Sequence, residues 1–343
     1  MKPRIAMTLG DPAGIGPELI AKLLAEPSVR HEANILLIAD RREVEEGMRV
    51  AGSKFEYAAA DSLDNLAFGE LPLLYDFRGT ATEPFVRRQS SSAGGRYSLD
   101  TLQVALDATT SGKTDVMMFG PLNKSSLHMA GMTSADELHW LAGQLGYRGP
   151  VCEFNVIDGF WTSRVTSHVA LRDVPDLITS PRVIEAIELI DGMLRRSGIE
   201  EPRIGICGLN PHCGDEGNFG REEIDVIGPA IAQALASGIR VNGPFPADTI
   251  FLKVQGNQRA YDAIVTMYHD QGQIALKLMG FSRGVTVLGG LPIPIVTPAH
   301  GTAFDIATKG VANAGATRQA FDMACRLGMS YRLAHSTGQA IAH

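Results

Sequence analysis

Short apolar runs alternate with stretches that have helical character, and this alternation constrains the fold more than any other feature of the sequence. The runs cover Arg4–Leu9, Asn34–Asp40 and Asp115–Pro121. A run that is apolar along its whole length is typical of a parallel strand buried on both faces. Helical stretches such as Tyr97–Thr110 separate the runs. Strands and helices in alternation predict an α/β fold with a mostly parallel sheet.

A second set of strand-like runs follows in the middle of the chain. The runs are Val151–Ile157, Thr162–Ser167 and Arg203–Leu209, and a long amphipathic helix is expected over Arg182–Arg196. This part also reads as α/β, because its strands and helices alternate. The sequence therefore predicts two α/β lobes.

The two lobes are expected to be built from three consecutive segments of the chain. Residues 1–132 and 263–343 form the first lobe, and residues 133–262 form the second. A cleft between two such lobes is a favoured place for a ligand. The polar segment Gly79–Gly95, rich in Ser, Gly, Thr and Arg, is predicted to be an exposed loop.

Composition and charge argue against nucleic acids and membranes as binding partners. The chain has 343 residues, 45% hydrophobic and 20% charged, enough to bury one large core or two smaller ones. Its formal net charge is −7, and no run of Lys or Arg exceeds two residues. Nucleic-acid binding needs a clustered basic surface, so no nucleic-acid partner is expected. No stretch has the character of a membrane span or a signal peptide, so no membrane partner is expected.

The cysteines indicate a reducing environment. The sequence contains four of them, Cys152, Cys207, Cys213 and Cys325, without CxxC spacing. This pattern predicts neither a disulfide framework nor a cysteine zinc site. We expect a soluble, cytoplasmic protein.

Three of the nine histidines stand where an apolar strand gives way to a loop. They are His168, His212 and His269, in the contexts VTSH, GLNPH and TMYH. Loops at the carboxyl ends of parallel strands line the ligand site of α/β proteins. Three imidazoles there can bind a divalent metal and leave open positions for substrate or water. The alternative is three hydrogen-bonded histidines at strand ends.

Three charged residues near these histidines are candidates for catalysis. Asp248 and Asp270 can orient an imidazole, although aspartate is also common in turns and caps. Lys277 follows His269 by about two helical turns and can bind a substrate anion or transfer a proton. Its alternative is an ordinary solvated lysine.

Two glycine-containing segments are candidates for nucleotide contact. Gly10–Glu18 joins a strand to a helix and carries three glycines, but matches neither a Walker loop nor GxGxxG. It is either a ligand loop or a structural turn. In His300–Asp305 the backbone and an imidazole can face an adenine or ribose, and the alternative is a helix cap.

Several motifs together resemble the 4-hydroxythreonine-4-phosphate dehydrogenase family. They are Gly10–Glu18, Leu209–His212, Gly243–Thr249 and Tyr268–Gly272, in the same order over residues 4–325. The segment HGTAFDIATKGVAN also resembles the nucleotide-binding loop of isocitrate and isopropylmalate dehydrogenases. This second resemblance implies their two-lobed fold, NAD or NADP as cofactor, and these cofactor-binding residues: Gly289, Gly290, His300, Gly301, Thr302, Ala303, Asp305 and Asn313.

The family resemblance implies a homodimer with its active site near the subunit interface. His168, His212 and His269 match the family's metal ligands, with His269 reaching the site of the partner subunit. Zinc is the expected ion, with magnesium, manganese or cobalt as alternatives. Lys277 matches a substrate-contacting lysine, and Asp248 lies in the matching PADT motif. The implied reaction is NAD(P)-linked oxidation of a secondary alcohol beside a carboxylate-bearing carbon, followed by decarboxylation.

The sequence departs from the family at the substrate contacts. The family's Gly-His-Thr-Glu motif is missing from Thr133–Ala142, where Glu137 and His139 are the candidate substrate residues, as are Arg283 and Thr286 further on. An acidic residue beside a phosphate is repulsive unless it is paired. We therefore expect a different hydroxy acid, such as a four-carbon sugar acid or its phosphate. The alternatives are a cyclic dihydrodiol carboxylate, a metal-dependent hydrolase or lyase without nicotinamide, and a non-catalytic binding protein.

Overall fold

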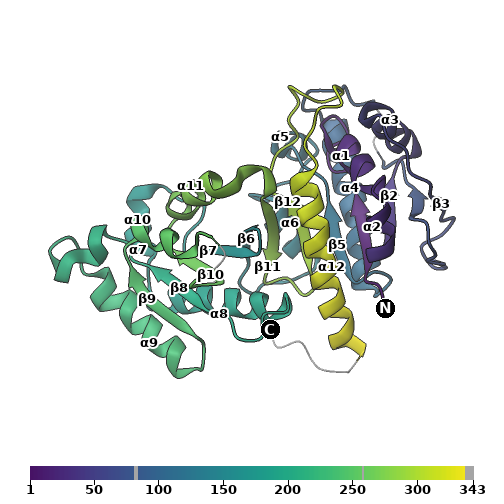
Figure 1. The fold of residues 1–343 in the computed structure, drawn as a ribbon. Coiled ribbons are helices and arrows are strands. Elements are labelled where there is room, and N and C mark those ends of the chain that lie inside the picture. Colours follow the sequence, from purple (N-terminus) through teal and green to yellow (C-terminus); the bar gives the residue numbers. More distant parts are fainter. Residues whose placement is uncertain (81–83, 257–258, 337–343) are drawn as a thin grey trace. The chain divides into compact units, whose positions relative to one another are not determined.

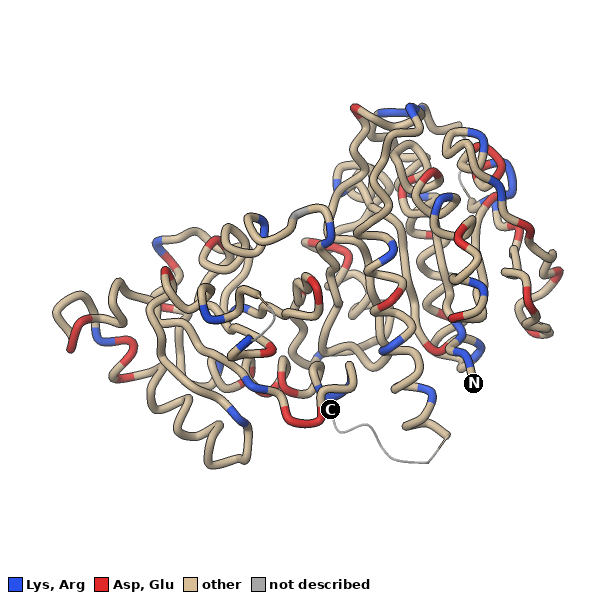
Figure 2. Tube along the Cα trace, in the orientation of Figure 1, with Lys and Arg blue, Asp and Glu red and all other residues tan. Residues whose placement is uncertain are grey.

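The computed structural model describes residues 1–80, 84–256 and 259–336, and it divides into two compact units (Figure 1). Unit 1 comprises residues 1–148, 282–287 and the described chain from 291 onward, and unit 2 comprises residues 149–281 and 288–290. No helix in the described ranges is both long and apolar enough to cross a membrane. Lys and Arg are scattered among Asp and Glu in both units (Figure 2).

Unit 1 contains a mostly parallel sheet with the strand order β3-β4-β2-β1-β5-β12-β11. Neighbouring strands are parallel, except for the antiparallel pair β11 and β12. The three apolar runs predicted in this unit are confirmed as β1, β2 and β5, which are neighbours. The strands are β1 (Arg4–Thr8), β2 (Asn34–Ala39), β3 (Ala58–Ala59), β4 (Leu73–Asp76), β5 (Val116–Phe119), β11 (Val285–Gly289) and β12 (Ile295–Pro298).

Helices cover the sheet of unit 1. α12, yellow in Figure 1, packs against β5 and β12, and α4 packs against β1. The helices are α1 (Gly16–Leu24), α2 (Pro27–Glu32), α3 (Arg41–Ala51), α4 (Ser92–Thr110), α5 (Lys124–Met129), α6 (Glu137–Gln144) and α12 (Gly315–Ser336).

The start of α4 corrects the prediction of an exposed loop through Gly95. Ser91 caps the helix, because its hydroxyl oxygen accepts a hydrogen bond from Gly94 N at 3.1 Å. Gly95 is buried in the first turn, where an added Cβ would lie 1.8 Å from Ser126 O of α5. The glycines that suggested a loop are needed for close packing of two helices. Part of the predicted loop, residues 81–83, lies outside the described residues.

The described residues of unit 2 form five strands in the order β6-β7-β10-β8-β9. All neighbouring pairs are parallel except β6 with β7. The strands are β6 (Cys152–Ile157), β7 (Phe160–Arg164), β8 (Ile204–Cys207), β9 (Val241–Phe245) and β10 (Ala263–Thr266). The helices are α7 (Val174–Leu177), α8 (Ser180–Arg196), α9 (Gly228–Ala236), α10 (Ala247–Ile250) and α11 (His269–Gly280).

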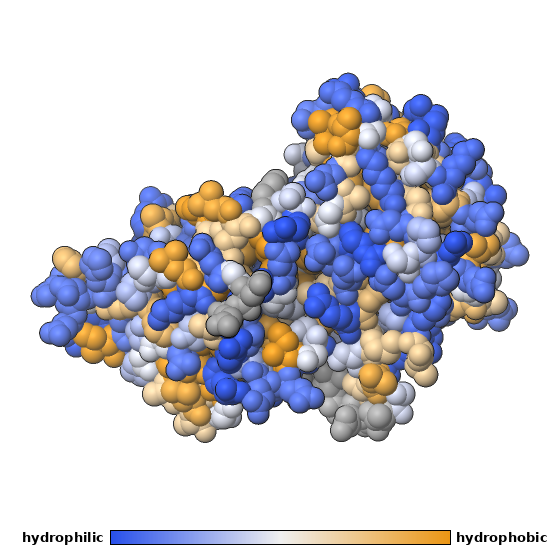
Figure 3. All heavy atoms as spheres, in the orientation of Figure 1, coloured by the Kyte–Doolittle hydropathy of each residue, from blue (hydrophilic) through white to orange (hydrophobic). Residues whose placement is uncertain are grey.

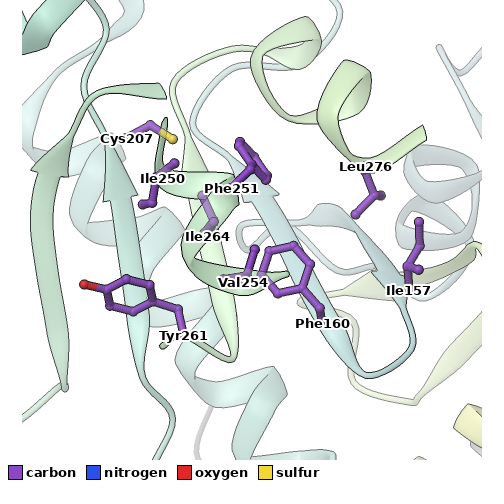
Figure 4. Packing of buried hydrophobic residues seen from close by; sticks show 9 residues of the cluster. All are labelled: Ile157, Phe160, Cys207, Ile250, Phe251, Val254, Tyr261, Ile264 and Leu276. Carbon is purple, nitrogen blue, oxygen red and sulfur yellow. The ribbon is translucent and has the colours of Figure 1, made fainter. Parts of the chain in front are cut away.

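One hydrophobic cluster of unit 2 lies between its strands and the segment that follows β9 (Figure 4). Phe160 of β7 and Phe251 meet edge to face, with ring centroids 6.5 Å apart. Ile250 and Ile264 are fully buried beside them. This packing fixes β10 and the short helix α10 relative to β7.

The unit boundaries differ from the expected lobes in three places, one of which is the short stretch 288–290, expected in the first lobe but part of unit 2. Residues 263–281 are expected in the first lobe, but β10 pairs with β7 and β8 of unit 2, and α11 packs against β7 and β10. Residues 133–148 are expected in the second lobe, but they belong to unit 1. The apolar pattern of β10 identifies a strand, but it does not identify the sheet that the strand joins.

Candidate active site

Three histidines follow the carboxyl ends of adjacent parallel strands in unit 2. β10 lies between β7 and β8 and is parallel to both. His168 follows β7, His269 follows β10 and His212 follows β8. Strand ends of this kind are where α/β proteins bind ligands. Each histidine is exposed or half-buried and is therefore accessible to a ligand.

Pairing between β7 and β10 continues past the strands and brings two of the histidines together. Thr166 N donates to Met267 O at 3.1 Å, and the Thr166 hydroxyl donates to the same oxygen at 2.8 Å. The imidazole rings of His168 and His269 lie 5.6 Å apart between centroids. Two strands thus deliver two imidazoles to one place.

Side chains at the start of α11 hold His269 and the adjoining loops. Asp270 Oδ1 lies 2.7 Å from His269 Nδ1. A proton on Nδ1 leaves the lone pair of Nε2 available to a metal or a substrate proton. The Gln271 side chain accepts from Met267 N at 2.7 Å and donates to Gly208 O at 2.8 Å. Gln271 therefore connects the loop before His269 with the loop that follows β8.

His212 lies on a strained segment of that second loop. His212, Cys213, Asp215 and Glu216 have φ values between 45° and 56°. This left-handed conformation costs roughly 1–2 kcal/mol for each residue that is not glycine. The Glu223 carboxylate accepts two backbone N–H bonds from the residues just before the segment, at 2.7 Å each. Strain that the surroundings maintain in this way is typical of functional sites.

The paired histidines fit two ligands of one metal ion. Imidazole nitrogens about 2.1 Å from a tetrahedral ion place the ring centroids about 5 Å apart, close to the separation of His168 and His269. The described residues contain no group of three or more His, Cys, Asp or Glu side chains close enough to hold a metal. The assignment of His212 as third ligand therefore stays a prediction.

The predicted catalytic residues Asp248 and Lys277 are both exposed in unit 2. Burial raises the pKa of the Cys213 thiol, and the charges of Glu223 and Asp248 raise it further. Asp248 lies in α10, directly after β9, and β9 packs against the strained segment that carries His212. Lys277 is on α11, the helix that begins with His269.

A buried arginine that the sequence analysis did not single out lies at the end of β7. The Arg164 side chain is 5% exposed and pairs with Glu153 at 2.8 Å. It also donates to Ser167 Oγ at 2.7 Å and to Asn155 Oδ1 at 3.2 Å. Gln273 of α11 donates to the same oxygen of Asn155. This network joins β6, β7 and α11 close to the paired histidines.

Gly289 and Gly290, predicted to contact the cofactor, are needed for packing within unit 2. A Cβ at Gly289 would lie 1.9 Å from Cε2 of Phe154. A Cβ at Gly290, where φ is 89°, would lie 2.1 Å from Pro150 O. Close packing against Phe154 and Pro150 is therefore sufficient to explain why glycine stands at both positions.

The other predicted cofactor residues lie on one segment of unit 1 between β12 and α12, which we call the 300–313 loop. They are His300, Gly301, Thr302, Ala303, Asp305 and Asn313. Thr302 is buried, whereas Gly301, Asp305 and Asn313 are exposed. An added Cβ at Gly301 would meet no atom within 4 Å, so the backbone there is open to a ligand.

His300 has the chemistry expected of a nucleotide contact. Its Nε2 is buried and has no hydrogen-bond partner among the described residues, while Nδ1 lies 3.1 Å from Gly301 O. Burial lowers the pKa of His300, against the opposing effect of the Gly301 contact. The ring is therefore neutral at pH 7. Because Nδ1–H donates to Gly301 O, the unpartnered Nε2 is an acceptor and fits a hydroxyl or an amino group of a nucleotide.

The start of α6 carries the predicted substrate residues Glu137 and His139. Asp136 caps this helix: its Oδ1 accepts from His139 N at 2.9 Å and lies 2.6 Å from His139 Nδ1. Burial favours a higher pKa for Asp136, but the hydrogen bonds from His139 outweigh it and hold the pKa below its usual value. Asp136 thus fixes the orientation of the His139 ring, which is 57% exposed.

The low pKa of Asp136 makes its stabilising effect dependent on pH. The unfolded-state pKa is about 3.9, so the contribution is complete above that pH and is lost as pH falls through the lower folded-state value. Asp136→Asn keeps a good cap but removes the charge, and we expect it to lower the free energy of unfolding at pH 7 by up to about 1 kcal/mol. Urea unfolding from pH 7 to pH 2.5 should show this difference shrinking below pH 4. A difference that is constant over that range would contradict the assignment.

The remaining predicted substrate residues lie in β11 and just before it. Thr286, in β11, is half-buried and pairs with Thr297 of β12, and Arg283 is exposed in the turn before the strand.

Comparison with known proteins identifies the family. The model of the family described as pyridoxal phosphate biosynthetic protein PdxA matches residues 31–324. A Pseudomonas aeruginosa protein named 4-hydroxythreonine-4-phosphate dehydrogenase 2 is 65% identical over 327 residues, 95% of this chain and 97% of that protein. A Bradyrhizobium diazoefficiens protein named D-threonate 4-phosphate dehydrogenase is 38% identical, over 94% of this chain and 96% of that protein.

A solved structure supports the same assignment. The crystal structure of 4-hydroxythreonine-4-phosphate dehydrogenase from Klebsiella pneumoniae superposes with a TM-score of 0.82 at 32% identity, covering 96% of this chain and 98% of that chain. These matches extend over nearly the whole of both chains, so they reach both α/β units. The chain therefore belongs to the PdxA family of dehydrogenases.

Proposed function

We propose that the protein oxidises the secondary alcohol of a phosphorylated four-carbon hydroxy acid, with NAD or NADP as the hydride acceptor and with decarboxylation of the product. Membership of a dehydrogenase family and the names of the two relatives support the reaction class. The observation that carries the proposal is the pair formed by His168 and His269 at the ends of neighbouring parallel strands.

The proposal assigns a divalent metal to His168, His269 and His212. A metal ion bound there supplies Lewis-acid polarisation, which lowers the pKa of the substrate hydroxyl. Asp270 holds His269 with Nε2 free by accepting a hydrogen bond from Nδ1–H. The strained backbone around His212 supports a functional role for that histidine.

The chain's own residues then bind and move the charged groups. The exposed ammonium of Lys277 binds a carboxylate or phosphate of the substrate. Asp248, exposed near the His212 segment, accepts the hydroxyl proton as hydride leaves for the nicotinamide ring. Oxidation beside the carboxylate-bearing carbon gives a β-keto acid, and loss of carbon dioxide follows from that chemistry. The 300–313 loop binds the nucleotide, with His300 contacting it through Nε2.

The residues at α6 support a substrate other than 4-phosphohydroxythreonine. Asp136 and Glu137 place two carboxyl groups where the family carries Gly-His-Thr-Glu, and His139 is held by one of them. The relative named D-threonate 4-phosphate dehydrogenase supports a sugar-acid phosphate. We assign the chain to that class of substrate, with Glu137, His139, Thr286 and Arg283 as the contacts.

The proposed enzyme is a homodimer in which each site combines His168 and His269 of one chain with His212 of the other. In this arrangement His212, and not His269 as the family resemblance implies, reaches across the subunit contact. Exposed apolar side chains support a subunit contact near these residues: Ile274 and Leu278 of α11 are 60% and 84% exposed, and Leu171 is 68% exposed. Hydrophobic atoms gather over the region of α11 in Figure 3. Helix faces of this kind are commonly covered by a partner.

NADH or NADPH formation across a panel of acids tests the proposed function. The panel contains 4-phosphothreonate, 4-phosphoerythronate, their free acids, 4-phosphohydroxythreonine and a cyclic dihydrodiol carboxylate, each with zinc, magnesium, manganese or cobalt. We expect kcat/KM for a sugar-acid phosphate to exceed that for 4-phosphohydroxythreonine at least about tenfold, the effect of one lost polar contact. A higher value for 4-phosphohydroxythreonine would overturn the substrate assignment. Absence of nucleotide reduction with every acid would overturn the reaction class.

A further inference from the structure

The glycine-containing segment Gly10–Glu18 does not form an open ligand loop. Every residue from Ile5 to Ala21 is buried. A Cβ at Gly16 would lie 1.9 Å from Leu9 O, and one at Gly10 would lie 2.4 Å from Pro121 O. These glycines allow the segment to fold tightly on its own unit, and the surface that it offers is already occupied by protein.

The 300–313 loop packs against the Gly10–Glu18 segment. Ile15 N donates to Thr302 O at 3.0 Å, and a Cβ at Gly14 would lie 2.7 Å from the same oxygen. Figure 1 shows the loop, in yellow-green, beside α1. A small hydrophobic cluster joins the two segments, and its buried members are Ile15, Leu19, Ala307 and Ala312. Buried side chains at intervals along the loop therefore face α1, and the exposed residues between them face outward.

Two charged side chains of α1 complete the contact. Lys22 Nζ donates to Gly310 O at 3.0 Å and to Ala312 O at 2.8 Å. Glu18 Oε1 accepts from Ala312 N at 2.8 Å and from Lys22 Nζ at 2.7 Å. The Glu18 side chain is 2% exposed and that of Lys22 is 24% exposed. Lys22 and Glu18 are one helical turn apart, so α1 presents an ion pair that binds both polar groups of a single loop residue.

We propose that Glu18 and Lys22 are positioning residues that hold the 300–313 loop in its nucleotide-binding conformation. This inference rests on the proposed role of the loop in binding NAD or NADP. Without the ion pair, the backbone groups at 310–312 bind water, and the loop must be ordered each time a nucleotide binds. Because ordering opposes binding, a preformed loop gives higher affinity from the same contacts. Neither side chain touches the reacting atoms, so the chemical step does not depend on them.

The test compares Lys22→Met with wild type by direct titration of NADH and NADPH and by steady-state kinetics. Because this variant loses a charged hydrogen-bond donor to the loop, we expect the Kd and KM of the nucleotide to rise about tenfold or more. The kcat at saturating nucleotide should stay within about twofold of wild type. Glu18→Gln should have a smaller effect in the same direction, and Lys22→Arg, which keeps charge and donors, should recover much of the affinity.

Lys113→Met is the matched control, because Lys113 makes a surface ion pair with Asp64 in the same unit. Hydrogen exchange supplies a readout that needs no cofactor: the Ala312 amide should exchange faster in Lys22→Met, while amides of β1 keep their protection. Unchanged exchange at Ala312 together with unchanged nucleotide affinity would overturn the inference. A wild-type protein that binds neither nucleotide would overturn the proposed function, and the inference with it. Equal loss of affinity in Lys113→Met would also count against a specific role for Lys22.

Discussion

Replacing His269 with alanine is expected to remove the bound metal and to lower kcat/KM by at least about a thousandfold. The variant loses one of the two imidazoles that lie 5.6 Å apart, and with it the Lewis-acid contribution of several kcal/mol. The fold should persist, because the His269 side chain is partly exposed at the start of α11 and lies outside the hydrophobic cluster of unit 2. Elemental analysis after dialysis and steady-state kinetics measure the two effects.

His31→Ala is the control for this variant, since His31 is an exposed residue of α2 in unit 1. A His269→Ala protein that keeps a full metal complement would contradict the assignment. Mixing it with an inactive His212→Ala protein tests the shared site, because a hybrid dimer then contains one site with all three histidines. We expect each hybrid dimer to reach about half of the wild-type activity, so that an equal mixture with random subunit exchange recovers toward about a quarter. No recovery after demonstrated subunit exchange would place all three ligands in one chain.

Replacing Arg164 with methionine is expected to lower the free energy of unfolding by about 3–5 kcal/mol. The change leaves the Glu153 carboxylate without its cation at a site where the arginine is 5% exposed, and removal of one partner of a buried ion pair has costs of this size. Asn155 and Ser167 each lose a donor as well. Urea unfolding followed by circular dichroism measures the change.

Arg221→Met is the matched control in the same unit. Arg221 pairs with Asp225 at 2.9 Å, but both side chains are more than half exposed, and pairs of that kind contribute about 0–1 kcal/mol. The double variant Arg164→Met with Glu153→Leu should recover part of the lost stability, because no charge is then left unpaired. Equal effects of Arg164→Met and Arg221→Met would contradict the importance of the buried network.

Much of this fold could be predicted from local patterns. β1, β2 and β5 coincide with mostly apolar runs, because strands buried on both faces contain few polar residues. The positions of His168 and His269 after strands were predictable for the same reason. Their proximity was not, because it depends on β10 lying beside β7, and strand order is set by packing between distant segments.

Other features of the site could not be predicted, because a glycine can serve either for close approach to a nucleotide or for close packing within the protein. Gly289 and Gly290 look like nucleotide glycines, but the structure uses their missing side chains to accommodate Phe154 and Pro150. Arg164 did carry a signal, since it is the one charged residue in the strand-like run Thr162–Ser167. Its partner could not be predicted, because Glu153 lies on β6 and comes beside Arg164 only through the antiparallel pairing of β6 with β7.

The position of β10 also bears on how the protein is made. This strand fills the centre of its sheet, yet it is synthesised after both of its neighbours, β7 and β8. A nascent chain that has passed β9 but not β10 has a gap with two unpaired strand edges, each able to pair with another chain. Translation that pauses before residue 263 prolongs this state, so we expect pausing there to lower the yield of soluble protein.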